Sequence, residues 1–393
     1  MDTISTCDEK RVSLNSDRPT RVIVNGIHSK SGGGVTYLRK ILPLLSRIPE
    51  LEIHLFIHKS QFHLFYPVDE KINVCLFSYK ETFLRTLIWE QLAIPIKAWA
   101  LRSDVVFSPA NYGPLLVRNH VILLRNAVSV IKLINDPRTI LYWLGLSLAT
   151  FVSFFAAKKS IAVSVYAKKI LTFGLSERFS RKCSIVYHGV EIPPSDRVEN
   201  VLHQSDILAV SDIYVQKNYD TLNKAISHLV KRRPKLRLVI IGEEIDLHYV
   251  KKVKTLIKKL KIESNILFKG YVRNNEIMNY YMSCKVFVFP SHVETFGNSL
   301  LEAMACGAPI ACSRSAVMPE IIGDGGLFFN PNDEYDIAEK IEQLLANDEL
   351  SKKLSDEASR RAARFTWDVT ALKTKDVLIE ASEPRSNKQI RPL

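Results

Sequence analysis

The chain has 393 residues, of which 47% are hydrophobic and 24% are charged, and its formal net charge at pH 7 is +13. This length allows two domains that each bury a full hydrophobic core, and the composition is that of an ordinary globular protein. The basic balance suits a nucleotide ligand or an anionic membrane surface better than nucleic acid, because no helix-turn-helix, zinc-finger or RNA-binding motif accompanies it.

The two ends of the chain and its cysteines indicate where the protein works. Residues 1–18 are polar and include acidic side chains, so they are predicted to form a disordered tail and not a signal peptide. Residues 384–393 are predicted to form a second polar tail. The six cysteines are scattered without the spacing of metal ligands, which indicates small buried side chains in a reducing compartment. The expected location is the cytoplasm, with peripheral attachment to the inner face of the membrane as an open addition.

The first glycine-rich segment of the chain follows a predicted strand at residues 21–27. Three successive glycines, including Gly33 and Gly34, then lead into a helix predicted at 35–45. A helix N-terminus behind a glycine loop attracts anions, because free N–H groups point outward and no side chain blocks the approach. The segment is therefore a candidate ligand-binding loop. A loop that is merely flexible is the alternative.

Three further strands are predicted at 51–58, 104–109 and 120–126, and a helix that Pro95 interrupts is predicted at 86–100. Arg125 lies near the end of the third strand. Its position at the carboxyl end of a strand makes it a candidate ligand for a phosphate or an anionic acceptor, which a guanidinium binds bidentately. An arginine cannot act as a base. The alternative is a surface or ion-paired arginine.

Residues 140–157 form the most apolar run in the sequence. Their length is near the lower limit for a membrane span, but Gly145, Ser147, Thr150 and Ser153 dilute the run. The prediction is a core helix of the first domain. A helix seated in a bilayer interface is the alternative.

A linker is predicted at residues 191–205, which hold two prolines and many polar side chains. The second domain then opens with a strand at 206–211, followed by Lys217 and a helix at 219–231. A strand at 237–242 and an amphipathic helix at 250–260 come next. This alternation of strands and helices is typical of a parallel sheet.

The most informative stretch runs from Val286 to Pro331, where a buried strand, a polar loop, a helix ending at Gly307 and a second strand form a βαβ unit. Glu294 lies in the loop and Glu302 lies in the helix. A helix N-terminus binds phosphate, whereas the two carboxylates accept hydrogen bonds from hydroxyl groups. Phosphate together with many hydroxyls describes a nucleotide sugar. The alternative is that both glutamates are solvated surface charges.

This stretch resembles the retaining glycosyltransferases of the GT-B fold, in the clan called glycosyltransferase group 1 or family 4. The signature is ETFGNSLLEAMACG at residues 294–307, and the segment PEIIGDGGL at 319–327 is a second similarity. The resemblance implies an α/β protein with two Rossmann-like domains that face each other across a cleft. It places an acceptor-side domain at 19–192, a nucleotide-sugar-binding domain at 205–365 and a helix at 366–383 that returns to the first domain.

The resemblance also implies roles for particular residues. Lys217 matches a lysine that holds the nucleotide's phosphates, and Glu302 and Glu294 would bind the ribose and the transferred sugar. The remaining contacts with the donor are expected from Gly33, Gly34, Gly270, Tyr271, Phe296, Gly297, Asn298 and Ser299. Two positions depart from the family: Asp212 stands where an arginine is usual, and Arg125 stands near the usual histidine. Arg125 or Arg314 is a candidate replacement for the missing cation.

The function expected from these observations is retaining transfer of a sugar from a nucleotide-sugar donor to a glycan or lipid-linked acceptor. Lys217, Glu294 and Arg125 are the candidate catalytic residues. No metal and no cofactor are expected, because no Asp-x-Asp motif ends a strand and because a helix dipole and Lys217 can stabilise a departing diphosphate. An anionic membrane surface remains a further candidate partner. The alternative function is a catalytically silent GT-B protein that binds a nucleotide sugar or a partner.

Overall fold

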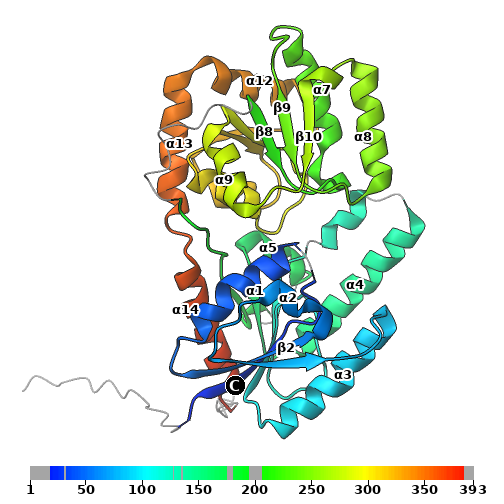
Figure 1. Cartoon of the computed structure of the whole chain (residues 1–393), viewed down its shortest axis with the longest axis vertical. Coiled ribbons are helices and arrows are strands. Elements are labelled where there is room, and N and C mark those ends of the chain that lie inside the picture. The colour runs from blue at the N-terminus through cyan, green and yellow to red at the C-terminus, as the bar shows by residue number, and fades with distance from the viewer. Residues whose placement is uncertain are drawn as a thin grey trace, which may run out of the picture.

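The computed structural model describes residues 18–30, 32–126, 128–133, 136–174, 180–193 and 206–384. Nearly all of both predicted tails, and most of the predicted linker at 191–205, lie outside these residues. The described chain forms two α/β domains, one above the other in Figure 1. The prediction of two Rossmann-like domains is therefore confirmed.

The N-terminal domain is built on a seven-stranded sheet in the order β3-β2-β1-β4-β5-β6-β7, and every neighbouring pair is parallel. Its core strands are continuously buried, as expected when helices cover both faces of a parallel sheet. The strands are β1 (Thr20–Asn25), β2 (Leu51–His58), β3 (Ile72–Phe77), β4 (Val105–Ser108), β5 (His120–Leu124), β6 (Lys159–Ala162) and β7 (Cys183–Ile185).

The C-terminal domain repeats this plan with a six-stranded parallel sheet in the order β10-β9-β8-β11-β12-β13. In both sheets the strand order reverses once, between β1 and β4 and between β8 and β11, and such switch points open a crevice at the carboxyl ends of the strands. The strands are β8 (Ile207–Val210), β9 (Leu238–Ile241), β10 (Ile266–Gly270), β11 (Val286–Phe289), β12 (Ile310–Ser313) and β13 (Leu327–Phe329).

Helices connect the strands and cover the sheets. In the N-terminal domain they are α1 (Gly32–Leu45), α2 (Phe62–Phe65), α3 (Phe83–Ala100), α4 (Pro137–Ala156) and α5 (Val165–Leu171). In the C-terminal domain they are α7 (Tyr219–Val230), α8 (Leu247–Leu260), α9 (Asn274–Ser283), α10 (Asn298–Ala305), α11 (Met318–Ile322), α12 (Glu334–Ala346) and α13 (Asp348–Ala362). The last helix, α14 (Trp367–Ser382), lies beside the N-terminal domain at the lower left of Figure 1.

Two helices differ from their sequence predictions. α1 begins at Gly32, so the glycine segment is the first turn of the helix and not a loop in front of it. α3 runs through Pro95 without interruption, and Leu101 N–H still bonds to Lys97 O at 2.9 Å in its last turn. A proline removes only one helical donor, so the helix continues where its neighbouring bonds remain.

The prediction that residues 140–157 form a core helix is wrong. Only Thr150, Ser153 and Phe154 of α4 are buried, whereas Leu144 and Leu148 are 53% and 64% exposed. Two of the three buried side chains are thus small and polar, whereas most of the large apolar side chains of α4 face outward. A mean apolar composition could not reveal this, because it carries no information on which face meets the protein.

The junction between the domains passes through Gly189, which packs directly against the start of α14. Val190 N–H donates to Phe365 O at 2.9 Å, and Thr370 Oγ1 donates to Tyr187 O at 2.8 Å. A Cβ atom at Gly189 would lie 2.2 Å from the backbone nitrogen of Trp367. Only glycine allows this approach of two backbones.

Gly189→Ala is therefore expected to destabilise the protein by about 1–3 kcal/mol, the range for an overpacked interior site. The measurement is the denaturant midpoint of the purified chain. Gly145→Ala is the matched control, because a Cβ there meets no atom within 4 Å and alanine is favoured over glycine inside α4. If both variants unfold like the wild type, the close packing of Gly189 on α14 is refuted.

Candidate active site

A cleft of about 1530 Å³ lies between the two domains at the carboxyl ends of both sheets. Segments that follow β1 and β5 line it from the N-terminal domain, and segments that follow β8, β9, β10 and β11 line it from the C-terminal domain. Ten predicted site residues line this cleft: Gly33, Arg125, Lys217, Tyr271, Glu294, Phe296, Gly297, Asn298, Ser299 and Glu302. The two switch points therefore bring residues from distant parts of the chain to one site.

Two helix N-termini, one from each domain, meet at this cleft. A Cβ atom on Gly33 in the first turn of α1 would lie 3.5 Å from Asn298 Nδ2 at the start of α10. Gly297 precedes α10 with φ of +83°, a conformation that favours glycine. The first helical bond of α10 runs from Leu301 N–H to Gly297 O, so the preceding amides have no partner within the helix. Both helix dipoles and these amides favour an anion in the cleft.

Lys217 and Glu294 form an ion pair at the centre of this site. Lys217 Nζ lies 2.5 Å from Glu294 Oε1, and the two side chains are only 16% and 17% exposed. The ammonium group also lies 5.7 Å from the centre of the Phe289 ring. The lysine is held in place by the next residue, since buried Asn218 adopts a left-handed conformation and donates to Pro290 O and Pro331 O. The pair keeps both charges compensated in the absence of a ligand.

Arg125 lies on the opposite side of the cleft, at the end of β5. Its backbone N–H donates to Asn111 Oδ1 at 2.8 Å, and its buried Nε has no hydrogen-bond partner among the described residues. Burial lowers the pKa of Arg125, but a guanidinium stays charged in any protein environment. A Cβ on Gly34 would lie 2.4 Å from its Nη2, so Gly34 leaves the space that the guanidinium occupies. The interpretation of Arg125 as a surface or ion-paired arginine is wrong.

Glu302 is held at the cleft by Tyr281, whose hydroxyl donates to Oε2 at 3.0 Å. Burial raises the pKa of Glu302 to about 7, and the Tyr281 hydrogen bond opposes that rise. The alternative interpretation of Glu302 as a solvated helix residue is therefore wrong. A carboxylate with a pKa near neutrality binds hydroxyl donors best when it is ionised.

The sequence prediction missed His188 as a site residue. Its Nδ1 lies 3.0 Å from Asn298 Oδ1, its ring lies against Phe296, and it lines the cleft. Burial lowers the pKa of His188 to about 4, so the ring is neutral at physiological pH. Its Nε2 has no hydrogen-bond partner in the described part of the chain. The position of His188 directly after the last strand of the first sheet, at a carboxyl edge, was the signal available in the sequence.

Three residues that the sequence suggested for donor binding do not line the cleft. Gly34 supports Arg125 and does not line the cleft, and Gly270 ends β10 without lining it. Arg314 is exposed at the end of β12 and does not line the cleft, so it is not the replacement cation. Asp212 does line the cleft, where its Oδ1 accepts a bond from Glu243 N–H at 2.9 Å.

Within the described residues, no group of three or more His, Cys, Asp or Glu side chains is arranged to hold a metal ion. The groups that favour an anion in the cleft are backbone amides, Lys217 and Arg125. Metal independence stays a prediction.

A protein-family model matches the part of the chain that includes most of the C-terminal domain. Residues 195–361 match the family model "Glycosyl transferases group 1". The serotype-specific mannosyltransferase WbdA of Escherichia coli is 28% identical over 198 residues, which are 50% of this chain but 24% of WbdA. An uncharacterized glycosyltransferase of Methanocaldococcus jannaschii is 24% identical and aligns with 92% of this chain and 99% of its own length.

Solved structures show the same architecture over both domains. Anabaena HepE, solved in complex with UDP-glucose, superposes with a TM-score of 0.73 at 16% identity, covering 92% of this chain and 99% of that protein. At this identity the likeness establishes the fold, which is the GT-B arrangement that the sequence predicted. The match to the family model "Glycosyl transferases group 1" thus includes most of the described C-terminal domain, and the two domains together have the GT-B fold.

Proposed function

We propose that the protein is a retaining glycosyltransferase that moves a sugar from a nucleotide-sugar donor to a glycan or lipid-linked acceptor without a metal ion. The observation that carries this proposal is the meeting of two helix N-termini with Lys217 and Arg125 in one interdomain cleft. These groups favour a diphosphate, and the carboxylates of Glu294 and Glu302 beside them suit the hydroxyls of two sugars. The mannosyltransferase name of one relative and the UDP-glucose bound to HepE support a nucleotide-sugar donor.

The ion pair between Lys217 and Glu294 suggests how the donor binds. A diphosphate oxygen would replace Glu294 as the partner of Lys217, while sugar hydroxyls would donate to the released Glu294 carboxylate. Lys217 would then exchange one anionic partner for another, and Glu294 would accept hydrogen bonds from neutral hydroxyls in place of its ion pair. On the other side of the donor, Glu302 would accept hydrogen bonds from the ribose hydroxyls.

The chemical step uses few protein groups. The acceptor hydroxyl would attack the anomeric carbon from the face that the diphosphate leaves, so that the new glycosidic bond keeps the original configuration. The oxygen that departs with the diphosphate would take the proton from the acceptor hydroxyl. The amides of Asn298 and Ser299, Lys217 and Arg125 would stabilise the negative charge that develops on the leaving group.

A catalytically silent donor-binding protein is the second candidate, and Asp212 favours it. Its carboxylate stands in the cleft at the position where the family usually has an arginine, which subtracts one cation and adds one anion near the diphosphate. A charge-assisted contact contributes about 1.5–3 kcal/mol. An assay for donor hydrolysis and sugar transfer separates the candidates, because a silent binder releases no sugar.

Lys217→Ala is expected to lower kcat/KM for sugar transfer by about ten- to a hundredfold, the equivalent of one lost charge-assisted contact. Glu294→Ala is expected to weaken donor binding as well, because it removes the acceptor for the sugar hydroxyls. Lys285→Ala is the control, since Lys285 pairs with Asp206 at the opposite edge of the sheet. Wild-type transfer and donor binding in both site variants would refute the proposed roles.

Gly34→Ala is expected to reduce donor affinity nearly as much as Arg125→Ala, because the added methyl would displace the guanidinium. The double variant should be no weaker than Arg125→Ala alone, as expected for residues that act through one contact. Gly145→Ala serves as the control, since Gly145 does not line the cleft and its Cβ would meet no atom within 4 Å. Isothermal titration with a nucleotide sugar measures these affinities. Additive losses in the double variant would contradict support of Arg125 by Gly34.

The raised pKa of Glu302 predicts that donor affinity increases with pH. The hydroxyl-accepting form is the carboxylate, and a pKa of about 7 leaves the group mostly protonated below neutrality. Affinity for a nucleotide sugar should thus be about tenfold weaker at pH 6 than at pH 8. Glu302→Gln should remove this dependence, because the amide does not titrate. A pH-independent wild-type dissociation constant would show that Glu302 does not accept the ribose hydroxyls in its ionised form.

A further inference from the structure

The N-terminal domain exposes an unusual amount of apolar side chain along two of its helices. On α4 the exposed residues repeat at three- and four-residue intervals and so form one stripe: Leu141, Leu144, Leu148, Phe151, Val152 and Phe155. On α3 a second stripe consists of Ile88, Leu92, Ile96 and Trp99. In both helices the apolar stripe faces away from the domain, which reverses the usual orientation of a helix on a sheet.

The segment around Leu115 and Leu116 joins the two stripes. Both leucines are exposed, and Leu115 N–H donates to the Gln91 side chain of α3 at 2.9 Å. Two residues earlier, Gly113 N–H donates to Ser153 Oγ of α4. The segment is thus fastened to both helices. We call the surface formed by the two stripes and these leucines the α3–α4 face.

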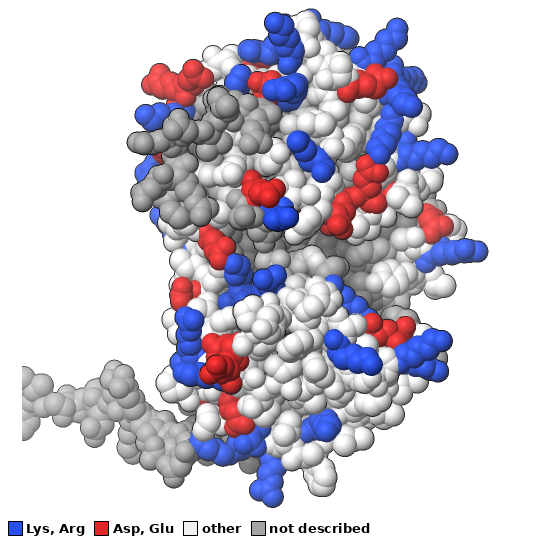
Figure 2. Space-filling view, in the orientation of Figure 1, with Lys and Arg blue, Asp and Glu red and all other residues white. Residues whose placement is uncertain are grey.

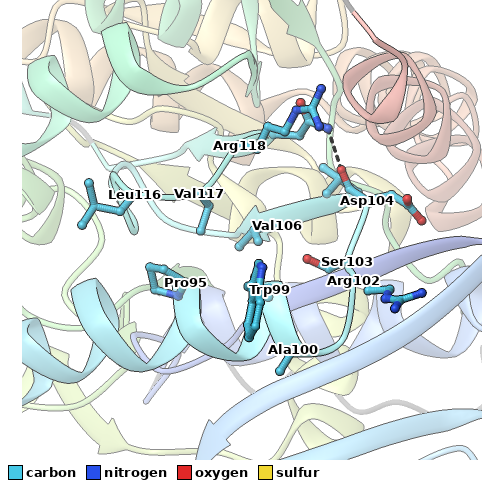
Figure 3. A pocket seen from close by; sticks show the side chains of 13 residues that line it. Pro95, Trp99, Ala100, Arg102, Ser103, Asp104, Val106, Leu116, Val117 and Arg118 are labelled. Carbon is cyan, nitrogen blue, oxygen red and sulfur yellow. Dashed lines mark hydrogen bonds between the residues drawn. The ribbon is translucent and has the colours of Figure 1, made fainter.

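A pocket of about 630 Å³ opens at one end of the α3–α4 face. Figure 3 shows Pro95 and Trp99 on α3 opposite Leu116 and Val117, with Arg102 and Arg118 further along the pocket. Asn119 and Asp104 also line the pocket, and Asn119 Nδ2 donates to Asp104 O at 2.8 Å. Trp99 is 83% exposed. An exposed tryptophan next to arginines is a common arrangement at a membrane–water interface.

The exposed charged side chains within α3 and α4 are all basic, and Asp136, which caps α4, is an exposed acidic residue next to them. The only acidic residue within α3 and α4 is Glu90, which is fully buried. The basic residues Arg85, Lys97 and Arg138 in these helices are exposed, as are Arg102 and Arg118. Figure 2 shows that uncharged side chains cover much of the lower domain, with Lys and Arg and some Asp and Glu at its margins. An apolar surface edged by cations complements a bilayer that contains anionic lipids.

We propose that the α3–α4 face docks the protein on the surface of a membrane containing anionic phospholipids. The exposed leucines and aromatic side chains would enter the headgroup region, and the surrounding lysines and arginines would contact lipid phosphates. The first turns of α4 also border the interdomain cleft through Tyr142 and Trp143, so docking brings the cleft close to the lipid surface. The binding itself does not rest on the proposed sugar transfer.

α4 is, among the described helices, the one long and apolar enough to cross a membrane. The sheet argues for an in-plane position instead. α4 connects β5 to β6, and these strands pair in parallel from Val121 and Lys159 to Leu124 and Ala162. Phe154 is fully buried against the domain, and Lys182 caps the end of α4 by donating to carbonyls of Phe154 and Ala157. A spanning helix would have to abandon these contacts, whereas an interfacial helix keeps them.

The test is flotation of the full chain with vesicles of phosphatidylcholine, alone or mixed with phosphatidylglycerol, in the absence of any donor. We expect at least about tenfold tighter binding to the anionic vesicles, since each interfacial cation adds to the attraction. Raising the salt from about 0.1 M to 1 M should weaken this preference, because the screening length falls from about 10 Å to 3 Å. Equal binding to both vesicles, or no binding, would overturn the proposal.

The double variant Leu144→Glu, Leu148→Glu should lose at least about tenfold in binding, because charge replaces two inserted side chains. Leu247→Glu is the matched control, as Leu247 is 72% exposed but lies on α8 of the other domain. If the double variant fails to fold, Trp99→Ser on α3 replaces it in the comparison. Wild-type binding by the folded variants refutes the proposal. So does a wild-type dimer, seen by light scattering, that these substitutions dissociate, because the face would then bind a second copy.

Discussion

The loop between β11 and α10 is the part of the molecule on which both the site and the domain arrangement depend. Thr295 O accepts a bond from Ser164 Oγ at 2.6 Å, and Thr295 Oγ1 donates to the backbone carbonyl of Arg125. Phe296 packs against Tyr187 and His188 from the other domain. The loop that carries Glu294 and leads into the N-terminus of α10 is therefore also the loop that ties the domains together. Movement of the domains would displace the candidate binding groups directly.

Few cationic side chains line the cleft. Lys217 and Arg125 approach from different domains, and Lys252, which also lines the cleft, is paired with Asp220. Backbone amides and helix dipoles, which need no counter-ion, add to the positive potential. Asp212 opposes them from the end of β8. Because Lys217 is paired with Glu294 in the free protein, its charge becomes available to a ligand only when another group satisfies Glu294. A ligand that brings a phosphate group together with sugar hydroxyl groups meets this condition.

The outer helices of the two domains expose different kinds of side chain. The amphipathic helix α8 of the C-terminal domain buries Val250, Val253 and Ile257 and exposes lysines, as a soluble helix should. α4 of the N-terminal domain differs, since it buries Thr150, Ser153 and only one large apolar side chain, Phe154, whereas its outer side carries several leucines and phenylalanines. The same sheet plan thus supports two kinds of surface, and this difference is the basis for assigning membrane contact to the N-terminal domain alone.

The sequence by itself determined the two-domain α/β architecture and identified ten of the residues that line the cleft. Alternating strands and helices follow from short-range periodicity, and residues at the carboxyl ends of parallel strands must meet at one edge. Only the tertiary structure decided the rest. The burial of Glu302 and His188, the support of Arg125 by Gly34 and the exclusion of Arg314 all depend on contacts between residues far apart in sequence. The outward orientation of α4 was likewise decided there, because an apolar run has the same composition whichever of its faces meets the protein.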